Sequence, residues 1–540
     1  MKKDDLQYLI KNKILRLSNY EDINFNTVDW TYNPYNHTTY IFILHKMEYL
    51  LDLAYFYINT KEENVKNIIF DILNSWYLSC NDKLDNPWIF HDHATALRVS
   101  NILKILNMMK DYINKDEFLL LQKILTMDVN KLLLDEFYSK YTNHGLDQSI
   151  ALYEASFFLE TDNIIDVRNI ATNRINEELR FAFCSDGGHK ENSPAYLSYG
   201  ISQVLRALDI GYKYEQEYSK IYFPLDLLKK SCLVLGYFIQ FDGTLPLIGD
   251  TTTLKVNNCL ADKSSMHNCK EYQNYIYLIS NGKEGIKPDE DLLFLKDSGY
   301  AIIKDFENRL NLVFKCKHIS NYHRHNDDLN FTLFYDNEEW FVDGGLYEYS
   351  EKDKFRKYLR SHFSHNLTYP NNFEAHRNLN RSSKTHINNM SSKNIYKFEG
   401  YSYMFDGFEN YRSIEYDKNN LTFTIVDKCK ILNKELENVI LKNNVTYVTN
   451  FIIPKNKIIL IDKLNKCVKI IGKNKVLHLI YQDNIDNIYI EENYISRKMN
   501  TKEKVNVLKF CHNHIYLDTI FHLAYFSDFI NYNLGCNHVY

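Results

Sequence analysis

The spacing of hydrophobic residues divides the chain into a helical part and a strand-rich part. From about residue 38 to 285, apolar residues recur at intervals of three and four, as in 102–106 and 119–125, which is typical of helices with one buried face. Breaks with glycine or proline separate helix-length segments, for example at 86–87 and 186–188. Successive helices with short connections predict antiparallel hairpins, stacked as a solenoid or closed into a toroid.

Short β-rich runs replace the helical pattern from about residue 299 onward. Runs of this density, with turn residues between them, are typical of an antiparallel sandwich. The clearest runs are 300–303, 331–335, 421–426, 458–461 and 476–481. The sequence therefore predicts an α+β, multidomain protein with a helical domain at 1–288 and a β-sandwich domain at 289–540. We expect the polar segment 253–291 to be an irregular linker or surface excursion.

Composition narrows the function classes only a little. The 540 residues are too many for one ordinary core, and 45% hydrophobic and 25% charged residues are typical of soluble globular proteins. A net charge of −5 argues against a nucleic-acid binder, although it leaves room for a local basic groove that binds an anionic glycan. The 43 tyrosines fit either a coding bias toward AT-rich codons or the stacking of sugars on aromatic rings.

The cysteines and the N-terminus bear on the compartment. Ten scattered cysteines without a C-x-x-C pair exclude a zinc ribbon or a dithiol redox motif, and buried reduced thiols favour a reducing compartment. The N-terminus lacks an apolar signal region, and charged residues interrupt the apolar stretch 39–57, so we expect a buried helix there and no membrane span. A cytoplasmic location is expected, with the periplasm left open as an alternative.

Three polar clusters in the helical part could carry chemistry. The first, 86–93, is either a helix cap with a packed aromatic or a sugar platform of Trp88 with His93 and Arg98 facing a cleft. The second holds Asn143 and His144 in what could equally be an ordinary turn before a helix. The third, 186–199, combines glycines and polar side chains at the start of a new helix, as ligand-binding loops do.

The fourth cluster lies in the strand-rich part. His323 and His325 would project from one face if their segment were extended, because side chains alternate along a strand. Asp343 follows the next apolar run and His365 lies further along, so the cluster could bind a divalent metal, transfer protons or do both. The alternative is a set of unrelated surface histidines.

The order of these motifs resembles the heparinase II/III family of polysaccharide lyases. It runs from an Asn-His turn and an Asp-Gly…Glu-x-Ser-Pro-x-Tyr loop to His-x-His-x-Asp-x-Leu-x-Phe, Asp-x-Gly and a late Ser-His-Asn, over roughly residues 85–370. The resemblance implies an incomplete α/α toroid followed by an antiparallel β-sandwich. It also implies a lyase that acts on an acidic, uronic-acid-containing polysaccharide by β-elimination.

In such an elimination the enzyme neutralises the uronate carboxylate, a base removes the C5 proton and an acid protonates the leaving oxygen. Carried over by motif, Asn143 binds the carboxylate, with His144 as a second candidate. Tyr196 is the acid and, for one C5 configuration, also the base. His323 is the base for the opposite configuration or assists Tyr196, and Tyr199 is an alternative one helical turn away.

The resemblance also implies a metal site. His325, Asp343 and His365 would hold a divalent metal in a structural role, with zinc as the expected ion. Glu191 and Arg360 would orient the neighbouring groups and contribute to substrate binding.

The division of labour between His323 and His325 has a geometric requirement. If both lie on a strand, their different roles require a twist or bulge at Arg324.

Two other functions are compatible with the sequence. A glycoside hydrolase on a similar toroid would need two carboxylates across the bond, with Asp186, Glu191 or Asp250 as candidates. A carbohydrate-binding or surface-glycan assembly protein could have kept the fold and lost the activity.

Overall fold

The structure is a computed structural model of the 540-residue chain. It describes residues 1–17, 20–35, 38–159, 164–256, 269–376, 383–435, 437–438, 446–482, 484–512 and 517–528. Contacts divide the chain into two compact units. Unit 1 comprises Met1–Ala182 and Ser202–Pro224, and unit 2 comprises Phe183–Ile201 and Leu225–Tyr540.

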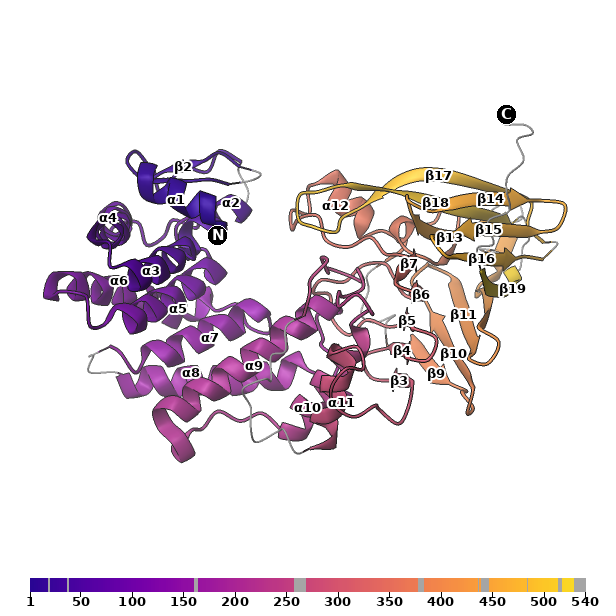
Figure 1. Ribbon diagram of the computed structural model, residues 1–540, viewed down its shortest axis with the longest axis horizontal. Coiled ribbons are helices and arrows are strands. Elements are labelled where there is room, and N and C mark those ends of the chain that lie inside the picture. The colour runs from indigo at the N-terminus through magenta and orange to yellow at the C-terminus, as the bar shows by residue number, and fades with distance from the viewer. Residues whose placement is uncertain are drawn as a thin grey trace. The chain divides into compact units, whose positions relative to one another are not determined.

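Unit 1 is built from helices that pack against their neighbours in the chain (Figure 1). The pairs α3 with α4, α5 with α6, and α7 with α8 are in contact, and α5 also packs against α2, α3 and α7. This central position explains why α5 is buried on nearly all sides. The elements are α1 (Lys3–Asn12), β1 (Ile14–Leu15), β2 (Ile23–Asn24), α2 (Thr38–Lys46), α3 (Tyr49–Thr60), α4 (Glu63–Cys80), α5 (Asp92–Met109), α6 (Lys115–Leu133), η1 (Asp135–Phe137), α7 (Asn143–Ala155), α8 (Ile164–Ala182), the second part of α9 (Pro194–Glu215) and η2 (Gln216–Tyr218).

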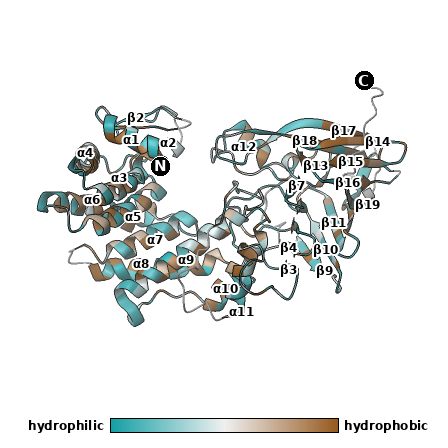
Figure 2. Cartoon of the chain, viewed as in Figure 1, coloured by the Kyte–Doolittle hydropathy of each residue, from teal (hydrophilic) through white to brown (hydrophobic). Residues whose placement is uncertain are grey.

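Most helices carry both hydrophobic and hydrophilic stretches (Figure 2), as the three- and four-residue spacing predicts. Among the described residues, no helix is long and apolar enough to cross a membrane. The eight cysteines in the described part of the chain form no disulfide with one another.

Within its described residues, unit 2 contains three antiparallel sheets. The five-stranded sheet has the order β3 (Leu292–Leu295), β4 (Tyr300–Asp305), β5 (Leu310–Lys315), β6 (Asn330–Tyr335) and β7 (Glu338–Phe341). The eight-stranded sheet has the order β14 (Ile458–Asp462), β15 (Cys467–Ile471), β16 (Lys475–Ile480), β19 (Leu517–Asp528), β12 (Thr422–Ile431), β11 (Phe408–Asp417), β10 (Ile395–Ser402) and β9 (His386–Asn389). The four-stranded sheet has the order β17 (Asn487–Ile495), β18 (Glu503–His512), β13 (Tyr447–Pro454) and β8 (Thr368–Pro370).

One hydrophobic core joins these sheets into a sandwich. Phe314 and Phe331 of the five-stranded sheet, Phe398 of the eight-stranded sheet and Phe451 of the four-stranded sheet lie in the same buried cluster. All five strand runs expected from the sequence are observed as β4, β6, β12, β14 and β16. Short helical elements, α12 (Lys354–Leu359) and η4 (His362–Ser364), follow the five-stranded sheet.

Helices α10 (Leu225–Phe238) and α11 (Lys270–Ile279) belong to unit 2. The buried Lys304 of β4 donates hydrogen bonds to the carbonyl oxygens of Gly236, Ile239 and Leu278 at the ends of these two helices. The expected boundary at 288–289 lies between helix α11, which ends at Ile279, and the first strand of the sandwich, which begins at Leu292. The two compact units divide earlier in the chain, because unit 1 ends at Pro224. The segment 253–291 also contains the helix α11 and is not wholly irregular as expected; its residues 257–268 lie outside the described part.

Candidate functional site

The first turn of α9 carries Tyr196 and belongs to unit 2, where a polar loop connects it to the segment before His323. Asn192, two residues before Pro194, donates hydrogen bonds to the carbonyl oxygens of Ser320 (3.0 Å) and Tyr322 (2.9 Å). The Asn192 side-chain oxygen accepts a third bond from the backbone N–H of residue 319. The loop before Tyr196 and the loop before His323 are thus joined directly.

The His323–His325 segment is a loop and not the strand expected from its sequence. β6 begins only at Asn330, and the segment from 321 to 329 consists of turns and irregular backbone. His323 has a φ of 51°, in the left-handed region that non-glycine residues rarely adopt. Such strain persists only where surrounding contacts fix the backbone, and it often accompanies functional sites.

The Tyr196 and His323 rings stack, with centroids 3.8 Å apart and an interplanar angle of 21°. The Tyr196 hydroxyl lies 3.0 Å from the hydroxyl of Tyr349. Burial, followed by the charges of neighbouring groups including Asp250, raises the pKa of Tyr196 well above its ordinary value. Burial likewise raises the pKa of Tyr349 to about 12. Both phenols therefore keep their protons at neutral pH.

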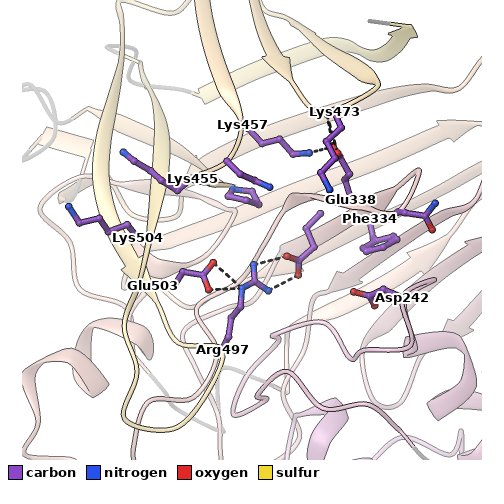
Figure 3. Close-up of a pocket in the computed structure, with 13 residues that line it drawn as sticks. Asp242, Phe334, Glu338, Lys455, Lys457, Lys473, Arg497, Glu503 and Lys504 are labelled. Atoms are coloured by element: carbon purple, nitrogen blue, oxygen red, sulfur yellow. Dashed lines mark hydrogen bonds and ion pairs between the residues drawn. The ribbon is translucent and has the colours of Figure 1, made fainter.

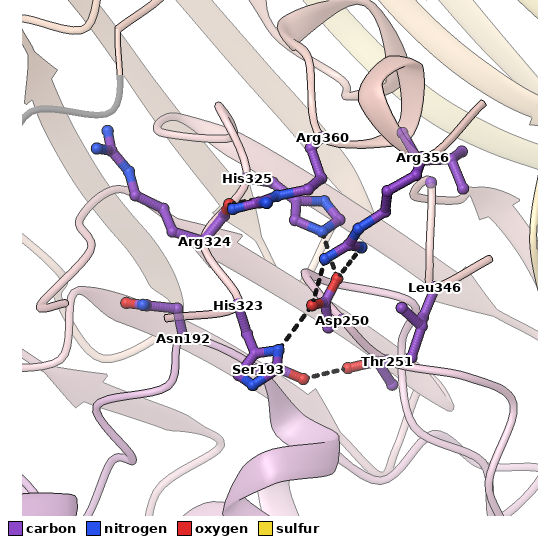
Figure 4. Close-up of polar contacts among 12 residues, drawn as sticks. Asn192, Ser193, Asp250, Thr251, His323, Arg324, His325, Leu346, Arg356 and Arg360 are labelled. Atoms are coloured by element: carbon purple, nitrogen blue, oxygen red, sulfur yellow. Dashed lines mark hydrogen bonds and ion pairs between the residues drawn. The ribbon is translucent and has the colours of Figure 1, made fainter. Parts of the chain in front are cut away.

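A buried carboxylate, Asp250, lies between His323 and Arg356 (Figure 4). Its Oδ2 is 2.8 Å from His323 Nδ1, and its Oδ1 is 2.8 Å from His325 Nε2. The Arg356 guanidinium of α12 donates to both oxygens, with Nη2 2.7 Å from Oδ2. Although burial opposes it, the Arg356 charge and the histidine hydrogen bonds hold the pKa of Asp250 well below its ordinary value.

Glu191 and Arg360 lie beside these groups, as expected. Glu191 is buried, and its Oε2 is 3.5 Å from His323 Nε2. Arg360 donates from Nε and Nη2 to the carbonyl oxygen of Arg324, at 3.1 and 2.8 Å, and so helps to fix the histidine loop. Whether either residue contacts a substrate stays a prediction.

Two of the three expected metal ligands converge. Among the described residues, the ligand atoms of Asp327, Asp343 and His365 lie within 4.8 Å of one another and are buried. His325 is outside this group, since its Nε2 is bound to Asp250, but its ring centroid is 5.4 Å from that of His365. Burial lowers the pKa of His325 to about 4, so this ring is neutral at pH 7.

Whether His325, Asp343 and His365 together hold a metal stays a prediction, and one observation bears on it. The Nδ1 of His325 is buried without a hydrogen-bond partner among the described residues. Such an orphaned lone pair, on a ring near a second imidazole, suits a cation. Asp327, by contrast, forms a buried ion pair with Lys315, whose ammonium already balances its charge. Zinc as the bound ion stays a prediction.

In unit 1, Asn143 and His144 form the first turn of α7. The Thr142 side chain caps this helix by accepting from the backbone N–H of Gly145, at 3.1 Å. Gln203 of α9 donates to the Asn143 carbonyl oxygen, at 2.9 Å, and so fixes this turn. A helix N-terminus carries partial positive charge, which favours a nearby anion.

Two histidine–aspartate pairs lie next to this turn. His144 Nδ1 is 3.0 Å from Asp92 Oδ2, and His93 Nε2 is 2.8 Å from Asp147 Oδ2. The two imidazoles stack with centroids 4.1 Å apart. His93 and His144, expected from separate motifs, thus form one cluster.

The structure corrects the prediction for Arg98. This side chain is fully buried and donates to both oxygens of Asp128, at 2.8 and 2.6 Å. It therefore stabilises the helix core and is not exposed to a substrate. Trp88, in the turn before α5, and Tyr199, on α9, are half-buried, and their roles in substrate binding stay predictions.

A separate cavity of about 400 Å³ lies in unit 2 and is rich in lysine and arginine (Figure 3). Carboxylates already balance most of these cations. Arg497 pairs with Glu339 and Glu503, and Lys457 pairs with Glu338. Lys455 and Lys504 share Glu492. The cavity is consequently a poor candidate for binding an acidic glycan.

Comparison with family models identifies the chain. A model described as heparinase II/III N-terminus matches residues 5–275, and one described as heparinase II/III-like, C-terminal, matches residues 287–435. The chain belongs to the heparinase II/III family. The family resemblance and the enzyme class expected from the motifs, a carbon–oxygen lyase acting on polysaccharides, are confirmed. Comparison with curated protein sequences gives no significant match.

Solved structures confirm the fold class of a helical toroid followed by a β-sandwich. A heparinase III structure has a TM-score of 0.78 at 16% identity, over 96% of this chain and 84% of that one. A heparan sulfate lyase from Pedobacter heparinus has a TM-score of 0.68 at 16% identity, over 97% and 83%. A Streptomyces coelicolor chondroitin AC lyase, in complex with chondroitin sulphate, has a TM-score of 0.53 at 10% identity, over 89% and 74%.

Three residues around Tyr196 and His323 were not assigned from the sequence. Tyr349 and Arg356 lie in no recognised motif, and the sequence suggests Asp250 only as a hydrolase carboxylate. The available signal for Asp250 was the Gly249-Asp250 pair directly after an apolar run. Gly249 has a φ of 59°, and a Cβ there would lie 2.8 Å from the Asn192 carbonyl oxygen, so this tight turn requires glycine.

Proposed function

We propose that the protein cleaves a uronic-acid-containing polysaccharide by β-elimination. The observation that carries the proposal is the stack of Tyr196 on His323, together with the contact of Asp250 to Nδ1 of the histidine. This arrangement places a protonated phenol next to an imidazole that is hydrogen-bonded to a carboxylate. These are the acid and the base that an elimination needs.

In the proposed reaction, Asn143 and His144 at the start of α7 bind the uronate carboxylate and reduce its negative charge. This lowers the cost of the negative charge that develops when C5 loses its proton. His323 Nε2 takes that proton, and the carboxylates of Asp250 and Glu191 stabilise the charged ring. The Tyr196 hydroxyl then donates its proton to the leaving glycosidic oxygen.

The surroundings of the carboxylates argue against hydrolysis. Hydrolysis requires two carboxylates that can reach the sugar. Asp250 is buried and bound by two histidines and an arginine. Asp186 accepts hydrogen bonds from the backbone of residues 297 and 298, which leaves Glu191 as the remaining candidate of the three.

We assign a divalent metal, with zinc as the expected ion, to His325, Asp343 and His365. Bound there, the ion would hold the histidine loop against the sandwich and would supply structural stability. The reaction steps above are assigned to the side chains alone.

One assay separates the candidate functions. The protein is incubated with a panel of sulfated and unsulfated uronate polymers, and ultraviolet absorbance of the C4–C5 double bond is followed together with reducing ends. Elimination predicts that both signals grow together and that His323→Ala abolishes them. Reducing ends without the absorbance would indicate hydrolysis, and binding without either signal would indicate a carbohydrate-binding protein.

A further inference from the structure

We propose that Asp250 is a positioning residue that sets opposite tautomers in His323 and His325. For His323 the inference rests on the proposed function, because it explains how that ring is prepared as a base. For His325 it concerns the preparation of a metal ligand. One carboxylate would thus prepare both the proposed base, His323, and the proposed metal ligand, His325.

The tautomers follow from what a carboxylate can do in a hydrogen bond. An ionised carboxylate only accepts, so each ring nitrogen that faces it must carry a hydrogen. Asp250 is buried beside Arg356, which keeps it ionised. The hydrogen therefore lies on Nδ1 in His323 and on Nε2 in His325, each 2.8 Å from its oxygen.

In His323 this leaves Nε2 without a proton while the ring is neutral. The free lone pair is what a base needs, and Asp250 stabilises the ring once it has accepted a proton. The same logic operates when an aspartate orients the histidine of a Ser-His-Asp triad. The His323 side chain is also still partly exposed, at 18%, whereas Asp250 is completely buried.

In His325 the bond to Asp250 leaves the lone pair on Nδ1. That atom is buried without a hydrogen-bond partner among the described residues, and the ring lies 5.4 Å from that of His365. A neutral imidazole nitrogen is a good metal ligand when its other nitrogen donates to a carboxylate. The expected metal role of His325 is thereby compatible with its contact to Asp250.

With this arrangement, the different roles of His323 and His325 do not require the twist expected at Arg324. His323 and His325 approach the same carboxylate, and they differ in which nitrogen faces it. Opposite tautomers alone give the two rings different free nitrogens. Arg356 holds the carboxylate in place because it binds both oxygens and thereby opposes rotation.

The most direct test is nitrogen NMR of the full-length, metal-free protein with labelled histidine, at a pH where both rings are neutral. Signals are assigned by their loss in His323→Ala and His325→Ala. We expect a protonated Nδ1 and a bare Nε2 in His323, and the reverse in His325. The same tautomer in both rings, or averaged shifts, would overturn the proposal.

A variant tests the functional consequence. In Asp250→Asn the amide presents an N–H group to one of the histidines, which must then change its tautomer. We expect kcat to fall about 100-fold or more with KM changed less than about threefold. Zinc affinity, measured by competition with a chelating dye, should fall about 10- to 100-fold. Unchanged kcat and zinc affinity in a folded Asp250→Asn protein would contradict the assignment.

The matched control is Asp328→Asn. Asp328 is also a buried aspartate in contact with a histidine and an arginine, but these are His318 and Arg324 instead of His323 and Arg356. We expect both kcat and zinc affinity to stay within about threefold of wild type. An equal loss in this variant would attribute the Asp250 effect to general damage and overturn the proposal.

Failure of the proposed function can be told apart from failure of this inference. A wild-type protein that cleaves no uronate polymer rejects the proposed function, while the NMR and zinc measurements still decide the role of Asp250. If Asp250→Asn does not fold, the tautomers of the wild-type protein decide alone.

Discussion

Tyr196 and His323 have different polar neighbours although their rings are stacked. Burial and negative neighbours raise the pKa of Tyr196, so its hydroxyl keeps its proton at neutral pH and suits the acid step. His323 instead has Asp250 at one nitrogen and Glu191 near the other, an arrangement that accommodates an added proton. We therefore assign the base step to His323 and the acid step to Tyr196.

Removing the Tyr196 hydroxyl tests this assignment. Tyr196→Phe keeps the stacked ring and loses the proton donor, so we expect kcat to fall about 100-fold or more without loss of thermal stability. The control is Tyr212→Phe on the same helix, whose side chain is 77% exposed, and its activity should be unchanged. A fully active Tyr196→Phe protein together with an inactive Tyr199→Phe protein would move the acid role to Tyr199.

At the scale of elements, α8 positions the turn that carries Asn143. Glu178 of α8 accepts hydrogen bonds from the Tyr138 hydroxyl (2.5 Å) and from the backbone N–H of Tyr141 (2.8 Å), just before α7. Burial raises the pKa of Glu178 from 4.5 to about 7. The folded protein therefore holds a proton there that the unfolded chain releases.

This gives a pH-dependent stability with a defined sign. As pH rises from about 4.5 to 7, the unfolded chain binds fewer protons than the folded one, so stability falls across this window and stays lower above it. Glu178→Gln keeps an acceptor oxygen and removes the titration. We expect it to raise the free energy of unfolding at pH 8 by about 1–3 kcal/mol and to leave it unchanged near pH 4, measured by thermal melting.

Glu177→Gln is the matched control for that experiment. The side chain of this neighbouring residue is 44% exposed and pairs with Lys140 at the surface. Its replacement should change stability by less than about 0.5 kcal/mol at either pH. A Glu178→Gln protein that melts at the wild-type temperature at pH 8 would contradict the assigned pKa.

Lys304 connects two helices to the sheet of unit 2. Its ammonium donates to three carbonyl oxygens at the ends of α10 and α11, which would otherwise be buried without partners. We expect Lys304→Met to lower the free energy of unfolding by about 2–3 kcal/mol. Hydrogen exchange should accelerate in the last turns of both helices.

The exposed Lys393 provides the comparison for Lys304. Lys393→Met should leave both stability and hydrogen exchange at wild-type values. If Lys304→Met were as stable as this control, the capping role of Lys304 would be wrong.

At the scale of the whole molecule, the order of elements was predictable because it depends on local periodicity. The helical spacing before residue 285 and the five β-rich runs after it correspond to observed helices and strands. The prediction of a strand at 323–325 is wrong: the i, i+2 spacing of His323 and His325 suits a strand, but β6 begins only at Asn330. There, tertiary contacts from Asn192 and Asp250 determine the backbone.

The site was only partly predictable, for a related reason. Tyr196, His323 and the pair Asp343–His365 lie in motifs that the sequence displays directly. Asp250 lies 73 residues from His323 and 106 from Arg356 along the chain, so no local pattern joins them. Arg98 was misassigned because its partner Asp128 is 30 residues away, and burial is not visible in a short motif.

The central claim is that this protein breaks a glycosidic bond by elimination. The most direct measurement is mass spectrometry of the products formed from a uronate polymer in isotopically labelled water. Elimination predicts that one fragment of each cleavage is lighter than its hydrolytic counterpart by one water and that no label enters at the cleaved bond. Products that carry one labelled oxygen per cleavage would show hydrolysis and would contradict the account.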